Sequence, residues 1–235
     1  MRLLVSVVDV VEAREAYLGG ADIVDVKRPS EGSLGACPPR VIKEVREALP
    51  SSVEVSAAIG DFPDLPGSAS LAALGAAVAG AVYVKVGVYG PRTVDSASKL
   101  LGEVVDSVRG FKQGVKVVAA SYADYARAGC LSPWEVLEAG RRADVDVWMV
   151  DTKVKDGSPL LDFLGLEELR GLVEEAHAHG MEAAVAGSLS LGHLDIVKEA
   201  GADVVGFRSA ACGGDRVNGR VQRELVEELR RRLAA

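Results

Sequence analysis

The sequence predicts an α/β fold of the (β/α)8 TIM-barrel type. Apolar, β-branched segments alternate with longer helical patterns eight times along the 235 residues. Most of these segments lack a polar face, which is typical of parallel strands covered on both sides. Eight such units close into a barrel more readily than they leave an open sheet. We therefore expect one catalytic TIM-barrel domain over residues 1–235, with a doubly wound open sheet as the alternative.

The element boundaries follow from hydrophobic period and from helix start and stop signals. Ser132 before Pro133 is an expected N-cap, because a serine hydroxyl accepts from the first free N–H groups of a helix. Gly-Ala-Asp recurs at residues 20–22 and 201–203. Glycine ends a helix there because it adopts the left-handed conformation at little cost in free energy. The expected strands are 3–8, 21–27, 53–59, 81–86, 115–120, 145–151, 182–186 and 204–207, and the clearest helices are 39–49, 93–108, 133–142, 166–179 and 221–233.

The helical segment 68–81 is unusual because it contains no charged residue. An outer barrel helix that faces water should carry a polar face. We therefore expect this segment to pack against another subunit and the protein to be a homo-oligomer.

Composition excludes several classes of function. The net charge of -7 argues against general nucleic-acid binding, and no apolar run is long enough for a membrane span. Residue 2 leads directly into an apolar segment without the features of a signal peptide, so we expect a cytoplasmic protein. The three cysteines and three histidines lack metal-ligand spacing, which predicts reduced thiols, surface histidines and no metal. Dinucleotide, Walker and nucleophile-elbow motifs are absent.

Ionisable residues at the ends of alternate strands predict the catalytic site. Asp25 and Lys27 are two apart and so share one strand face, Lys85 ends the fourth segment, and Asp151 ends the sixth with Lys155 just beyond. Each charge alone is explained by an ion pair, but all of them at one barrel rim point to catalysis.

Small residues after the last two strands predict a phosphate site. Loops after strands seven and eight commonly bind phosphate in TIM barrels, because glycine and serine expose backbone N–H groups there. The residues that we expect to bind a substrate phosphate are Gly187, Ser188, Arg208, Ser209 and Gly213.

The second strand and its loop carry a long and distinctive motif, Ala-Asp-Ile-Val-Asp-Val-Lys at 21–27 followed by Pro-Ser-Glu-Gly-Ser-Leu-Gly-Ala at 29–36. With Val-Lys-Val-Gly at 84–87, Asp-Thr at 151–152, Lys-Asp-Gly at 155–157 and Ala-Gly-Ser-Leu at 186–189, the whole chain resembles the (5-formylfuran-3-yl)methyl phosphate synthase family of methanofuran biosynthesis. This family is also called 4-(hydroxymethyl)-2-furancarboxaldehyde-phosphate synthase. Arg28 departs from the smaller or polar residue expected before Pro29.

The resemblance implies a lyase that joins two molecules of glyceraldehyde 3-phosphate, a small triose phosphate, and releases phosphate and water. It also implies Lys27 as the Schiff-base lysine, Lys85 as proton acceptor, functional roles for Asp25, Asp151 and Lys155, and no cofactor. Two alternatives stay open. One is another class I aldolase or an enzyme like triose-phosphate isomerase; the other is an inactive barrel that senses phosphorylated metabolites.

Overall fold

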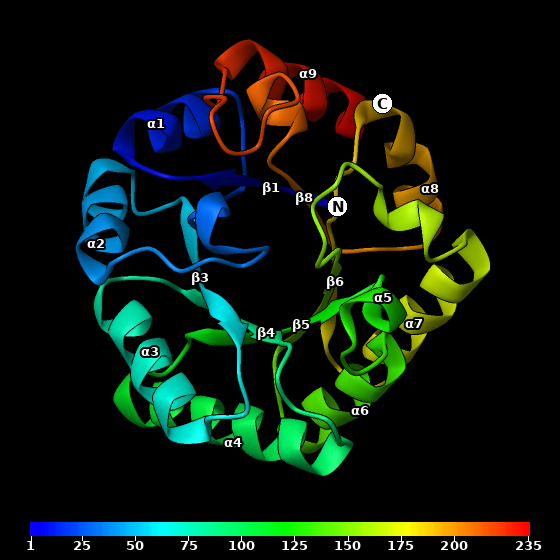
Figure 1. The fold of residues 1–235 in the computed structure, drawn as a ribbon. Helices are drawn as coiled ribbons and strands as arrows, with labels where there is room; N and C mark the ends of the chain where they lie inside the picture. The colour runs from blue at the N-terminus through cyan, green and yellow to red at the C-terminus, as the bar shows by residue number, and fades with distance from the viewer.

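Eight parallel strands form a closed barrel in the computed structural model, which describes residues 1–235, and the helices stand around it as an outer ring (Figure 1). Each strand pairs with its neighbours in chain order, and β8 closes the barrel onto β1. The TIM barrel is thus confirmed and the open sheet is wrong. The strands are β1 (Arg2–Val7), β2 (Ile23–Val26), β3 (Glu54–Phe62), β4 (Tyr83–Val88), β5 (Lys116–Tyr122), β6 (Val147–Asp151), β7 (Glu182–Val185) and β8 (Val204–Phe207).

The helices begin and end close to where the sequence predicts. Ser132 caps its helix by accepting from the N–H of Glu135, whose carboxylate accepts in return from the N–H of Ser132. Gly20 and Gly201 take the expected positive φ, at 93° and 84°. The helices are α1 (Val10–Leu18), α2 (Pro39–Ala48), α3 (Pro66–Val78), α4 (Val94–Phe111), α5 (Tyr125–Ala128), α6 (Pro133–Arg142), α7 (Leu166–Ala178), α8 (Leu194–Glu199) and α9 (Arg223–Ala234). None of them is long and apolar enough to cross a bilayer.

Several boundaries differ from the expectation by one to three residues, and two of the differences have a clear local reason. Helix α3 ends at Val78 and not at residue 81, because Gly80 adopts a φ of 108° and the N–H of Ala81 turns back to the carbonyl of Ala76. Strand β2 ends one residue before Lys27. The N–H of Lys27 still donates to the carbonyl of Val7, so the backbone of this lysine remains fixed to β1.

Two separate apolar cores stabilise the barrel. The larger contains 65 buried residues between the strands and the helices. The smaller contains 12 residues, among them Leu4, Met149 and Ala186, from side chains that point into the barrel and from Leu34 of the loop after β2. Toward the C-terminal ends of the strands the barrel interior becomes polar, with Asp25 and Lys85 fully buried there.

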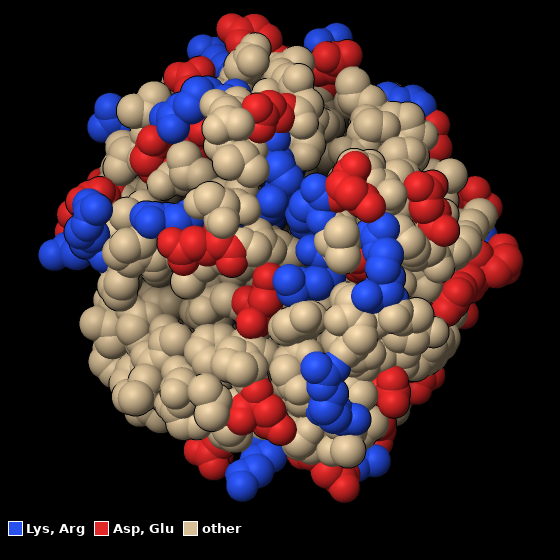
Figure 2. Space-filling model, viewed as in Figure 1, with Lys and Arg blue, Asp and Glu red and all other residues tan.

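The surface of α3 is the apolar face that its composition predicts. Leu71 is 72% exposed, and a shallow apolar groove runs beside it between α2 and α3. Figure 2 shows this part of the face as a hollowed area free of charged side chains. Whether a second subunit covers it stays a prediction.

We expect light scattering to give a mass above that of one chain, and Leu71→Glu to reduce it to one chain, because a carboxylate buried in an apolar interface is strongly unfavourable. Val11→Glu is the matched control, since Val11 is 64% exposed on α1, away from α3. A wild-type protein that scatters as a single chain at micromolar concentration would contradict the prediction that α3 packs against a second subunit.

Candidate active site

Strand β2 places a buried carboxylate inside the barrel. Asp25 pairs in register with Ser6 of β1 and accepts a hydrogen bond from its hydroxyl at 2.9 Å. The same Oδ2 atom accepts from Nζ of Lys85 on β4 at 2.7 Å. Burial raises the pKa of Asp25, but Lys85 and Lys27 outweigh it and lower that pKa below its usual value. The carboxylate and the Lys85 ammonium thus form a buried ion pair, and Oδ1 of Asp25 has no partner in the protein.

Lys27 comes two residues after Asp25, just beyond the end of β2, and is 6% exposed. Its Nζ makes one long hydrogen bond, to the carbonyl of Ser33 at 3.4 Å. Burial lowers the pKa of Lys27 to about 7; Asp151 and Asp25 oppose this shift, whereas Lys85 and Lys155 add to it. A large fraction of this amine is therefore neutral near pH 7, which is the form that attacks a carbonyl.

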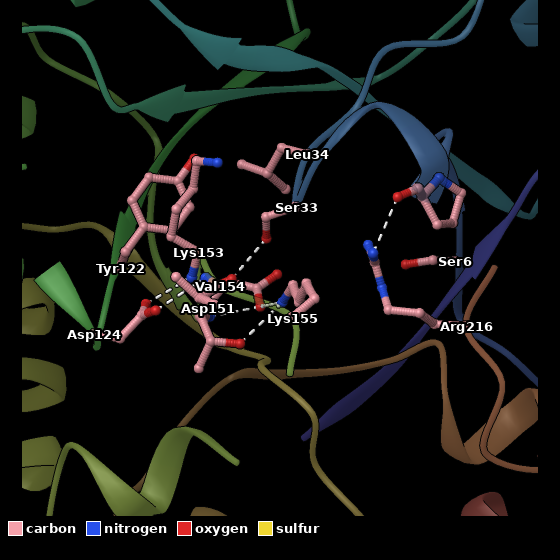
Figure 3. A network of polar contacts seen from close by, with 12 residues as sticks. Ser6, Ser33, Leu34, Tyr122, Asp124, Asp151, Lys153, Val154, Lys155 and Arg216 are labelled. Carbon is pink, nitrogen blue, oxygen red and sulfur yellow. Dashed lines mark hydrogen bonds and ion pairs between the residues drawn. The ribbon is translucent and has the colours of Figure 1, made fainter. Parts of the chain in front are cut away.

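Strand β6 supplies a second carboxylate with its own lysine. Oδ1 of Asp151 accepts from Nζ of Lys155 at 2.5 Å and from the N–H of Thr152 at 2.7 Å. Lys155 also donates to the hydroxyl of Thr152 at 3.0 Å (Figure 3). Burial raises the pKa of Asp151, but Lys155 and Lys27 lower it to about 2. The structure thus brings all five predicted catalytic residues to one end of the barrel.

The rate of imine formation at Lys27 should rise with pH and level off above a midpoint near 7, because only the unprotonated amine attacks an aldehyde. Borohydride trapping with unphosphorylated glyceraldehyde measures this rate without the titration of a substrate phosphate. In Asp151→Asn the midpoint should fall, because Asp151 raises the pKa of Lys27. A midpoint near 10, the value of an ordinary lysine, would show that Lys27 is not desolvated.

The loop of residues 28–36 after β2 lies across the mouth of the barrel. The Ser33 hydroxyl donates to the carbonyl of Thr152 at 2.8 Å, and Asp61 at the end of β3 accepts from the N–H groups of Ser33 and Leu34. Gly32 has a φ of 138°, and a Cβ there would lie 2.4 Å from the Asp61 carboxylate. Only glycine fits, so this part of the motif has a steric cause.

The sequence analysis did not identify Asp61 or the two residues that contact its carboxylate, Tyr122 and Lys153. Asp61 also accepts from the hydroxyl of Tyr122 at 2.5 Å and pairs with Lys153 at 3.3 Å. Figure 3 shows Tyr122 and Lys153 together on one side of the site. Asp61 is the last but one residue of β3 and Asp151 is the last residue of β6, and this similar position near a strand end was the signal available in the sequence.

The loops after β7 and β8 partly match the expected phosphate site. Gly187, Ser188 and Ser209 line the cavity at the barrel mouth. The backbone N–H groups of Gly187, Ser188 and Leu189 donate to no oxygen of the protein, and neither does that of Ser209. Ser188 has a φ of 50°, a left-handed value that is uncommon for a residue with a side chain. These loops therefore carry several backbone donors that no protein group uses, on residues that line the cavity.

Two of the expected phosphate residues are placed differently. Arg208 borders the cavity, but its guanidinium donates to the buried Glu12 of α1 and to the carbonyls of Ser6, Arg216 and Gly219. The protein itself thus occupies the donors of Arg208, and its distant partner Glu12 was not recognisable in the sequence; phosphate binding by Arg208 stays an untested prediction. Gly213 is exposed and does not line the cavity; its φ of 68° ends a short turn.

The lining of the cavity at the barrel mouth is rich in cationic side chains, three of which (Lys85, Lys155 and Arg208) are paired with a carboxylate. Figure 2 shows Lys and Arg side chains gathered near the centre of this face. Asp151 is the one carboxylate in its lining, against five cationic side chains: Lys27, Lys85, Lys155, Arg208 and Arg216. The histidines are elsewhere, where His177 contacts Asp203 and His179 contacts Glu175. Such a cavity suits a small anionic substrate.

Comparisons with known proteins agree with the motif-based resemblance. The family profile described as 4-HFC-P synthase matches residues 3–230. A (5-formylfuran-3-yl)methyl phosphate synthase from Methanocaldococcus jannaschii is 52% identical over 231 residues, which cover 98% of each chain. The protein of that name from Methanococcus maripaludis is 52% identical over 230 residues, covering 97% of this chain and 98% of the other.

Solved structures support the fold alone. KGPDC from Streptococcus mutans has a TM-score of 0.67 and 11% identity, covering 99% of this chain and 97% of that chain. The match of the family profile and the two relatives extends over nearly the whole chain, including β2 and its loop. The chain therefore belongs to the 4-HFC-P synthase family.

Proposed function

We propose that this protein is a lyase that condenses two molecules of glyceraldehyde 3-phosphate into 4-(hydroxymethyl)-2-furancarboxaldehyde phosphate, with loss of phosphate and water. The observation that carries the proposal is the Lys27 amine, which is buried beside two carboxylate–lysine pairs, with a pKa of about 7, in a cavity rich in cations. The names of its relatives support the product, and the excess positive charge supports a substrate that carries phosphate.

The first steps follow from the chemistry of an amine and a carbonyl. Neutral Lys27 attacks the carbonyl carbon of one triose phosphate, and loss of water gives an imine. The protonated imine withdraws electrons, so the neighbouring carbon loses its proton more readily. Lys85 lines the cavity and receives this proton once it has passed the proton that it carries to Asp25, whose carboxylate lies 2.7 Å from its Nζ. The resulting carbanion equivalent adds to the aldehyde of the second triose.

The later steps need groups that donate and accept protons near a leaving phosphate. Lys155 and Asp151 form such a pair across the cavity from β2 and β4, and the free N–H groups of 187–189 offer a place for phosphate oxygens. Ring closure and elimination change no oxidation state overall, so the condensation is balanced without an oxidant or reductant. We therefore assign no cofactor to the reaction.

Product identification tests this function directly. Purified protein supplied with glyceraldehyde 3-phosphate alone should form an ultraviolet-absorbing furan aldehyde and release inorganic phosphate in equal amount. Formation of an acyclic sugar phosphate would indicate another class I aldolase, and a simple triose isomer would indicate an isomerase. Binding without turnover would indicate a sensor. Each of these three results would refute the synthase assignment.

A further inference from the structure

Arg216 lies in the loop between β8 and α9 and was not expected from sequence to have a role. Its guanidinium lines the same cavity as Lys27, Lys155 and Ser188. Nη1 donates to the carbonyl of Pro29 and Nη2 to that of Gly32, each at 3.0 Å. Figure 3 shows Arg216 reaching toward the site from the side opposite Asp124. The side chain thus spans from the last loop of the barrel to the loop after β2.

The charge of Arg216 is not neutralised by the protein. Arg208, eight residues earlier, is paired with the buried Glu12, whereas no carboxylate lies within ion-pair distance of Arg216. The two carbonyls use one N–H of each Nη and leave Nε–H and the second hydrogen of each Nη without a protein acceptor. A half-buried guanidinium without a counter-ion is costly, and a planar set of free donors matches phosphate oxygens.

The backbone that carries Arg216 is well braced. The Asp215 carboxylate accepts from the N–H groups of Val217 and Asn218, both at 2.9 Å, and forms a tight turn. The Arg216 carbonyl accepts from Nε of Arg208 at 3.0 Å. Gly219 packs so closely that a Cβ there would lie 2.4 Å from the Asp215 carbonyl. A side chain on such a turn is held in position before any ligand binds.

We propose that Arg216 binds the phosphate of a triose phosphate in the cavity that contains Lys27. This deepens the proposed function, on which it rests, by adding a substrate-binding residue that is distinct from the free N–H groups of residues 187–189. It also takes the place that the sequence had suggested for Arg208. The free donors of Arg216 face the anion, and its two carbonyl contacts hold the loop of residues 28–36 beside it.

The test compares phosphorylated and unphosphorylated substrates in Arg216→Gln. Glutamine removes the charge but keeps an amide donor for a loop carbonyl. Borohydride trapping at Lys27 should become about 10- to 100-fold less efficient with glyceraldehyde 3-phosphate, the effect of losing a charged hydrogen bond. Trapping with glyceraldehyde should change little. Arg216→Lys should recover part of the loss, because it restores the charge without the fork.

Arg223→Gln is the matched control, since it removes an exposed arginine that pairs with Glu227 on α9. Equal losses with both aldehydes would make Arg216 only a brace for the loop and would overturn the proposal, as would no loss with either. Calorimetry with inorganic phosphate gives an independent measure: affinity should fall about 10- to 100-fold in Arg216→Gln and stay unchanged in Arg223→Gln. If wild-type protein traps neither aldehyde, the Schiff-base function fails, and the calorimetry still decides the role of Arg216.

Discussion

Lys27→Arg will yield no borohydride-stable adduct with glyceraldehyde 3-phosphate and will lose product formation by roughly 10⁴-fold or more. Arginine keeps the positive charge but has no amine that forms an imine. Lys155 is the rival nucleophile, and its surroundings argue against it. Its Nζ is engaged by Asp151 at 2.5 Å and by Thr152 at 3.0 Å, whereas Nζ of Lys27 has a single contact at 3.4 Å.

Peptide mapping of the reduced protein measures this outcome. The adduct in wild-type protein should lie on the peptide that contains Lys27, and Lys155→Arg should still be labelled there. Circular dichroism of both variants verifies that the fold is retained. An adduct on Lys155, or full labelling of Lys27→Arg, would reverse the assignment and leave Lys27 as an electrostatic partner of Asp25.

Asp25→Asn should lower the free energy of unfolding by about 3–5 kcal/mol, because it leaves the Lys85 ammonium buried without a counter-ion. Denaturant unfolding at neutral pH measures the change. Combining Asp25→Asn with Lys85→Met should recover most of the loss, since the double variant contains neither charge. Glu227→Gln, which breaks the exposed pair with Arg223, should cost no more than about 1 kcal/mol.

The buried ion pair of Asp25 and Lys85 also makes the stability of the protein depend on pH. The pKa of Asp25 is lowered by folding, so its contribution is fully present above the unfolded value of 3.8 and is lost as pH falls through the lower folded value. The difference between wild-type protein and Asp25→Asn should therefore narrow below about pH 3.8. A difference that is already absent at neutral pH would show that the pair contributes nothing.

Local sequence signals were enough to predict most of the scaffold. The sequence shows these signals directly, because each depends on residues that are near each other in the chain. Examples are the periodicity of strands and helices, the N-cap at Ser132 and the helix end at Gly20. That Asp25, Lys27 and Asp151 lie at one end of the barrel was predictable for a related reason: strand ends in a parallel barrel all meet at one rim.

The remaining parts of the site depend on partners far apart in sequence. Arg208 has a basic side chain after a strand, as a phosphate ligand would, and only the three-dimensional packing against Glu12, 196 residues away, reveals its structural role. Arg216 is the opposite case: nothing in its loop indicated a role in the site. Its loop has no helical or strand periodicity, and the residues that it contacts, Pro29 and Gly32, are 187 and 184 residues away in the sequence. Charge alone does not distinguish these two arginines.

The unequal size of the two apolar cores has a consequence for redesign. Most of the buried apolar surface lies outside the barrel wall, in the cluster of 65 residues, and only 12 residues form the inner one. Apolar exchanges of similar volume at Leu4, Met149 or Ala186 should thus remove little of the burial that stabilises the fold, although all three line the cavity. Libraries for directed evolution toward other phosphorylated aldehydes can vary these three positions together, provided that Asp25 and Lys85 are kept or replaced as a pair.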